Sequence, residues 1–74
     1  KSAATISFDK ALVGDNSSIE IFNIKGQKVK SFQVEHKINI IWNGKDMNNK
    51  ILPSGIYFIK LSSSKGNYSS KVML

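Results

Sequence analysis

The sequence contains no cysteine and no arginine. Without cysteine, neither disulfide bonds nor thiolate metal sites can supplement the core. All 11 basic residues are lysines. Lysine lacks the planar guanidinium group with which arginine makes paired hydrogen bonds to guanine or phosphate. The lysines are also dispersed along the chain rather than gathered in one run. These features predict a solubilising set of surface charges and argue against nucleic acid as a partner.

Long hydrophobic runs are also missing. No segment approaches the roughly 18 apolar residues that a membrane span requires, and no signal peptide opens the chain. The 74 residues suffice for one domain. Because the chain begins at Lys1 without methionine, we expect residues 1–74 to be a single-domain fragment of a longer protein, with any signal peptide upstream.

What the chain does contain is short segments of alternating apolar and polar residues. Ile6 and Phe8 share one face of the first segment, and Ile19 and Ile21 share one face of the second. No segment repeats with the 3.6-residue period of a helix, and turn-forming residues separate the segments. This pattern predicts an all-β fold, a small antiparallel β-sandwich. The predicted strands are residues 5–9, 18–24, 27–34, 38–42, 56–61 and 67–74.

Two of these strands carry further expectations. In residues 27–34, Val29 is expected on one face and Lys28, Lys30 and Phe32 on the other. Lysines along a strand are typical of an exposed sheet edge, where their charge discourages pairing with another molecule. Residues 56–61 are apolar apart from Lys60, which predicts a strand covered on both faces.

The last strand, residues 67–74, is expected to alternate. Tyr68, Val72 and Leu74 should share one face of this strand. The opposite face is expected to carry Ser69, Lys71 and Met73.

Turn chemistry is dense between the strands. Asn23-Ile24-Lys25-Gly26 predicts a tight hairpin in which Gly26 adopts the left-handed conformation and creates a bulge. A longer loop of Asn, Asp and Gly follows Trp42, and Pro53-Ser54-Gly55 forms a second turn.

Catalytic and metal-binding patterns are not found. His36 is the only histidine, and it has no partners at metal-ligand spacing. The five carboxylates form no close pair in the sequence, so no acid–base site is predicted. We therefore expect no enzymatic activity, no cofactor and no metal site from this chain. The carboxylates are Asp9, Asp15, Glu20, Glu35 and Asp46.

Two segments leave alternatives open. Asp46-Met47-Asn48-Asn49 is similar to the start of a calcium loop but lacks the later glycine and the closing glutamate. Turns closed by Asp and Asn side chains are the favoured explanation, although other loops could add oxygen ligands. Trp42 could stack on a sugar, but it follows Ile40 at strand spacing, which favours a place in the core.

Three pieces of the sequence, in order, resemble one large bacterial family. Residues 19–29 look like its first hairpin, and Trp42-Asn43-Gly44-Lys45-Asp46 looks like its central turn. Residues 53–61, starting Pro53-Ser54-Gly55, look like the closing pair together with Lys71-Val72-Met73-Leu74. The chain is similar to the C-terminal sorting domain of the type IX (Por) secretion system. That domain is in turn similar to the immunoglobulin-like domain of the flagellar hook-capping protein.

The resemblance implies an immunoglobulin-like sandwich of six to seven strands at the end of a secreted protein. Outer-membrane translocon proteins would recognise it in the periplasm and export the protein to the cell surface or the exterior. Gly55 would permit a sharp turn into the following strand, and the last strand would offer a β-edge and a lysine to the receptor. The implied sorting residues are Pro53, Gly55, Ile56, Tyr57, Lys71, Val72, Met73 and Leu74.

Other functions fit the same fold. The domain could be a structural linker or assembly module, or an accessory carbohydrate-binding module that uses Trp42. One departure from the family concerns Asn49, which stands where the family often has glycine. Since asparagine tolerates the left-handed conformation, we expect this turn to be preserved.

Overall fold

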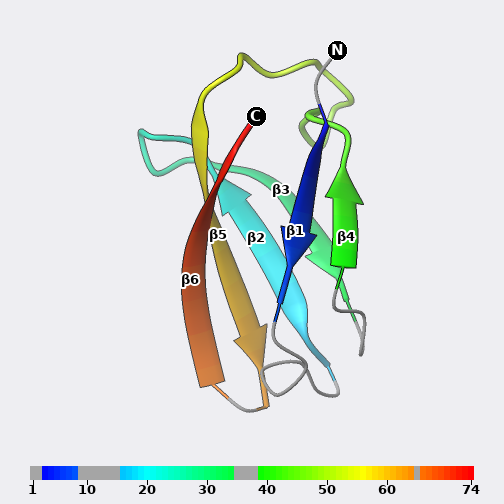
Figure 1. Ribbon diagram of the computed structural model, residues 1–74, viewed down its shortest axis with the longest axis vertical. Coiled ribbons are helices and arrows are strands. Elements are labelled where there is room, and N and C mark those ends of the chain that lie inside the picture. The colour runs from blue at the N-terminus through cyan, green and yellow to red at the C-terminus, as the bar shows by residue number, and fades with distance from the viewer. Residues whose placement is uncertain (1–2, 9–15, 35–38, 65) are drawn as a thin grey trace.

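Six strands in two antiparallel sheets make up the described part of the chain (Figure 1). The computed structural model describes residues 3–8, 16–34, 39–64 and 66–74. The smaller sheet pairs β1 with β4, and the larger has the order β3-β2-β5-β6. The predicted small antiparallel sandwich of immunoglobulin type is confirmed. The strands are β1 (Ala4–Ser7), β2 (Ser18–Phe22), β3 (Lys28–Gln33), β4 (Asn39–Trp42), β5 (Ile56–Ser63) and β6 (Gly66–Met73).

The core lies between the two sheets, where strand alternation brings every second residue inward. On β2 the inward residues are Ile19 and Ile21, both fully buried. β1 contributes Ile6 from the opposite sheet, and Phe8 packs against the same cluster, as the sequence predicted. The buried apolar residues are Ala4, Ile6, Ile19, Ile21, Val34, Trp42, Tyr57, Ile59 and Leu61.

One face of β5 is open, which corrects the prediction of a strand covered on both sides. Tyr57, Ile59 and Leu61 point into the core, but Ile56 and Phe58 are 41% and 44% exposed. No described element packs over this outer face of the larger sheet (Figure 1). The apolar run therefore reflects two different surroundings, a core on one side and solvent on the other.

The face assignment for β3 was also partly wrong. A register shift lies between Ile21 and Phe22, so Lys30 pairs with Ile21 while Lys28 pairs with Phe22. Lys28 therefore lies on the outer face, opposite to Lys30, because the extra residue of a β-bulge reverses the alternation. The expectation that this strand forms a sheet edge is confirmed.

The last strand alternates as predicted over its last three residues, whereas Tyr68, expected on the same face as Val72, is 36% exposed and lies outside the core cluster. Val72 and Leu74 pack against the core, whereas Met73 is 68% exposed. β6 pairs with β5 along its whole length and forms the other edge of the larger sheet.

The hairpin between β2 and β3 forms as expected. Gly26 has a φ of 83°, a left-handed conformation that glycine adopts at little cost. Its amide donates to the carbonyl of Asn23 (3.0 Å), and the Asn23 amide donates to the carbonyl of Gln27 (3.0 Å). The Asn23 side chain also accepts bonds from the amides of Lys25 and Gln27.

Some expectations lie outside the described residues. These are the end of the first strand, the turn at residues 14–15, the connector that contains His36, and Ile38. The described ranges include no helix with the length and hydrophobicity that a membrane crossing requires.

Candidate functional site

The loop between β4 and β5 is held together by Asp46. Its carboxylate accepts hydrogen bonds from the amides of Asn48 (2.8 Å) and Lys50 (2.9 Å). Asn49 has a φ of 66°, so it takes the left-handed conformation expected of it. The predicted side-chain-closed turns are therefore present, and Asp46 uses one carboxylate oxygen for both bonds.

Trp42 anchors this loop to the core. Its side chain is 0% exposed, and its indole N–H donates to the carbonyl of Lys45 (3.0 Å). A buried indole cannot stack on a sugar ring at the surface. The prediction of a core Trp42 is confirmed, and the carbohydrate-binding alternative that used it is wrong.

Tyr57 connects the same core to the Pro-Ser-Gly turn. Its ring packs edge-on against Trp42, with ring centroids 5.2 Å apart and an interplanar angle of 78°. Its hydroxyl donates to the carbonyl of Pro53 (2.7 Å). Since Trp42 is also bonded to the loop, the two aromatic residues fix both ends of the segment that leads into β5.

The turn also pairs with the end of the chain. The Gly55 amide donates to the carbonyl of Leu74 (3.0 Å), and the Leu74 amide donates to the carbonyl of Gly55 (2.8 Å). These two bonds extend the β5–β6 ladder by one residue pair beyond the match of Ile56 with Met73. Gly55 has a φ of 150°, which residues with side chains rarely adopt.

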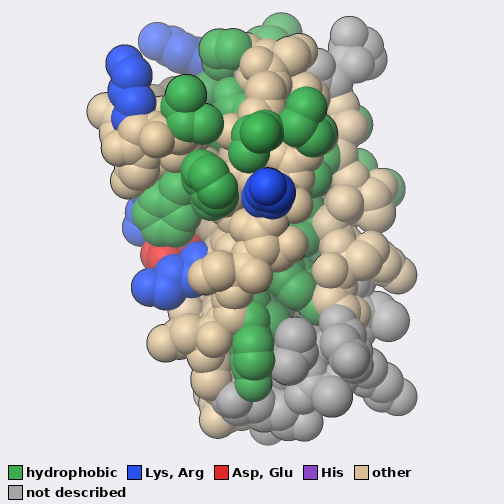
Figure 2. Space-filling model, turned by 60° about the vertical axis from the view of Figure 1, so that its left-hand side comes forward, with side chains coloured by type: hydrophobic (Ala, Val, Ile, Leu, Met, Phe, Trp, Pro, Cys, Tyr) green, Lys and Arg blue, Asp and Glu red, His purple; other side chains and the backbone are tan. Residues whose placement is uncertain are grey.

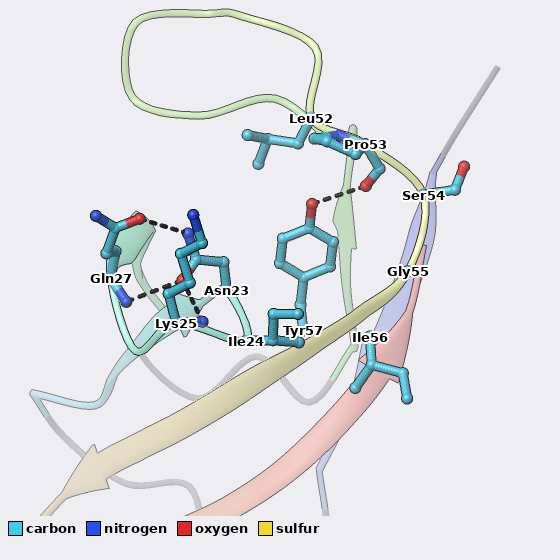
Figure 3. Close-up of a pocket in the computed structure, with 10 residues that line it drawn as sticks. All are labelled: Asn23, Ile24, Lys25, Gln27, Leu52, Pro53, Ser54, Gly55, Ile56 and Tyr57. Carbon is cyan, nitrogen blue, oxygen red and sulfur yellow. Dashed lines mark hydrogen bonds between the residues drawn. The ribbon is translucent and has the colours of Figure 1, made fainter.

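A shallow apolar pocket lies beside the paired residues Gly55 and Leu74 (Figure 3). It has a volume of about 260 Å³ and lies between the β2–β3 turn and the segment that enters β5. Leu52, Pro53 and Tyr57 are seen on one side and the turn at Asn23 and Lys25 on the other (Figure 3). The pocket is large enough to receive one apolar side chain.

The eight predicted sorting residues occupy one end of the larger sheet. The register pairs Ile56 with Met73 and Tyr57 with Val72, next to the pair of Gly55 and Leu74. They do not share one face, because Tyr57 is buried while Ile56 and Met73 are exposed. Their role in sorting stays a prediction.

Sequence reasoning missed two residues beside this site. Phe22 and Phe58 are directly paired across β2 and β5, on the outer face of the larger sheet. The signal that could have found Phe58 is Lys60, because a lysine two residues away on a strand marks the face that meets solvent.

The fold and the site define a small all-β module whose last strand closes against a Pro-Ser-Gly turn. The family model for the secretion system C-terminal sorting domain matches residues 1–74, and the chain belongs to this family. No curated protein and no solved structure gives a significant match to the chain.

Membership of the sorting-domain family assigns the function of the chain. The domain is a C-terminal sorting signal for type IX secretion, and it directs export to the cell surface or the extracellular space. It therefore interacts with the type IX secretion machinery. This assignment favours sorting over a structural linker.

Proposed function

We propose that the turn at Pro53, Gly55, Ile56 and Tyr57, together with residues 71–74, is the element that the outer-membrane translocon recognises. In this proposal the domain itself is non-catalytic. It ends a larger secreted protein whose activity resides in domains upstream.

The observation that carries the proposal is the pair of hydrogen bonds between Gly55 and Leu74, at 3.0 and 2.8 Å. These bonds join two segments that are distant in sequence into one surface. A receptor that contacts this surface can read the turn and the terminal strand together. Such a signal exists only in the folded domain, because the unfolded chain separates its two halves.

Two further features support recognition at this place. β6 is an edge strand in the described sheet, and a receptor can add a strand to such an edge through main-chain hydrogen bonds. The adjacent pocket of about 260 Å³ offers a place for an anchoring side chain, and buried anchors dominate the affinity of many interfaces.

The test is an export assay. The chain is fused to the C-terminus of a periplasmic reporter in a type IX-competent host, and the reporter outside the cells is measured. We expect export that is lost in a matched host without the translocon. Retention of the folded fusion in the competent host would contradict the sorting assignment.

A pair of variants separates recognition from stability. Deletion of residues 71–74 removes half of the proposed element and also weakens the β5–β6 pairing. Leu61→Ala is the matched control, because Leu61 is fully buried and lies outside the element. We expect the deletion to abolish export and Leu61→Ala to preserve it when both are folded at the assay temperature. Equal export of both variants would show that residues 71–74 only stabilise the fold.

A further inference from the structure

A row of paired residues crosses the outer face of the larger sheet. Lys28 pairs with Phe22, Phe22 pairs with Phe58, and Phe58 pairs with Lys71. The row therefore runs over all four strands, with a lysine at each end and two phenylalanines in the middle. We call these four residues the outer row.

The outer row lies in an exposed apolar surface. Phe58 is 44% exposed, and on β6 Met73, which pairs with Ile56, is 68% exposed. Figure 2 shows hydrophobic side chains gathered on the upper part of this side of the molecule, with lysine side chains among them. Contiguous exposed apolar residues with a polar rim are typical of interaction sites.

The charge of this face is positive. Lys60 and Lys71 form no ion pair within the described part of the chain. Lys28 lies 3.4 Å from Glu20, and both side chains are partly exposed. Such an exposed pair contributes little stability and can exchange partners. The face thus presents lysines around an apolar centre, with Glu20 as its only described carboxylate.

We propose that the outer row is a docking surface for a protein of the secretion machinery. Its partner surface carries an aromatic or aliphatic side chain for Phe22 and Phe58, flanked by carboxylates for Lys28 and Lys71. Neighbouring strands lie about 4.8 Å apart, so the backbone positions of the two lysines are about 14 Å apart. The inference rests on the proposed function, which it extends by giving the partner's chemistry.

A protein fits this surface better than an anionic membrane does. The apolar residues lie on a sheet face rather than on protruding loops, and they continue through Ile56 into the pocket. A pocket of about 260 Å³ beside a flat apolar face matches an anchor side chain within a protein interface. Lysines at the rim of such an interface orient the partner protein and raise the rate of association.

Two arms test the proposal in the reporter fusion. In the first, a photo-crosslinking phenylalanine analogue replaces Phe58, and the matched control places it at Ile41, which is 74% exposed on β4. We expect position 58 to crosslink to an outer-membrane protein of the secretion system and position 41 to give no such product.

The second arm measures export of the variants. Phe58→Thr keeps a residue that favours strands, and Lys28→Gln and Lys71→Gln leave the core unchanged. We expect each to lower export about fivefold, the loss typical of a residue that matters in an interface. Lys50→Gln makes the same charge change on the loop and should export as the unmodified fusion does. Urea unfolding of each purified variant confirms its fold.

The outcomes separate this proposal from the sorting assignment. If the unmodified fusion is not exported, both fall. If it is exported, but the Phe58, Lys28 and Lys71 variants are exported equally well and position 58 gives no crosslink, the outer row is refuted and the sorting assignment stands. If the purified chain instead binds phosphatidylglycerol vesicles through Phe58 while position 58 crosslinks no protein, the partner is a lipid surface and the proposal is wrong.

Discussion

The hydroxyl of Tyr57 holds the Pro-Ser-Gly turn against the core. Tyr57→Phe removes its 2.7 Å bond to the carbonyl of Pro53 and keeps the ring that packs on Trp42. The loss of such a bond costs about 1 kcal/mol when water can reach the freed acceptor, and Pro53 is exposed. A domain of this size has about 4–11 kcal/mol of stability in total, so the loss is measurable.

Urea unfolding followed by the fluorescence of Trp42, the only tryptophan, gives the assay. With a slope of about 1 kcal/mol per molar urea, typical of a small domain, the midpoint should fall by about 1 M. Tyr57→Leu is the comparison, because it also removes the edge-on ring contact, worth about 0.5–1.5 kcal/mol beyond its buried area. An unchanged midpoint for Tyr57→Phe would refute the claim that this hydroxyl fixes the turn.

Three further pairs of substitutions test other parts of the structure by the same urea assay. Gly26→Ala should cost about 1 kcal/mol because of the φ of 83° alone, and Gly26→Asn should cost less; equal costs would contradict a backbone origin. Asp46→Ala should lose about 1–2 kcal/mol with its two amide bonds, whereas Asp46→Asn should keep most of this stability. Leu61→Ala should cost about 2–4 kcal/mol and Ile41→Ala under about 0.5 kcal/mol, since Leu61 is 0% and Ile41 is 74% exposed; similar losses would show that the core is misplaced.

Local chemistry made much of the fold predictable. The strands follow from alternation, and the conformation of Gly26 follows from the hairpin sequence, because both depend on neighbours in the chain. Trp42 could be assigned to the core for the same reason, since Ile40 two residues earlier marks the inward face.

Contacts between distant segments were not predictable in the same way. The bulge between Ile21 and Phe22 depends on how β2 and β3 pair, and it moved Lys28 to the outer face. An apolar residue on a strand does not by itself show which sheet face is uncovered, so Phe58 was wrongly expected to be buried, although Lys60 on the same face of β5 pointed to solvent. The hydrogen bonds between Gly55 and Leu74 likewise appear only once β5 and β6 are paired.

The most direct test of the account compares two fusions in the type IX export assay. Ile56→Ser changes an exposed residue of the proposed recognition element, and Ile41→Ser changes an exposed residue of the opposite sheet. We predict that the Ile56→Ser fusion, although folded, stays in the periplasm while the Ile41→Ser fusion is exported. Equal export of the two would contradict recognition of the turn at residues 53–57 and its paired terminal strand.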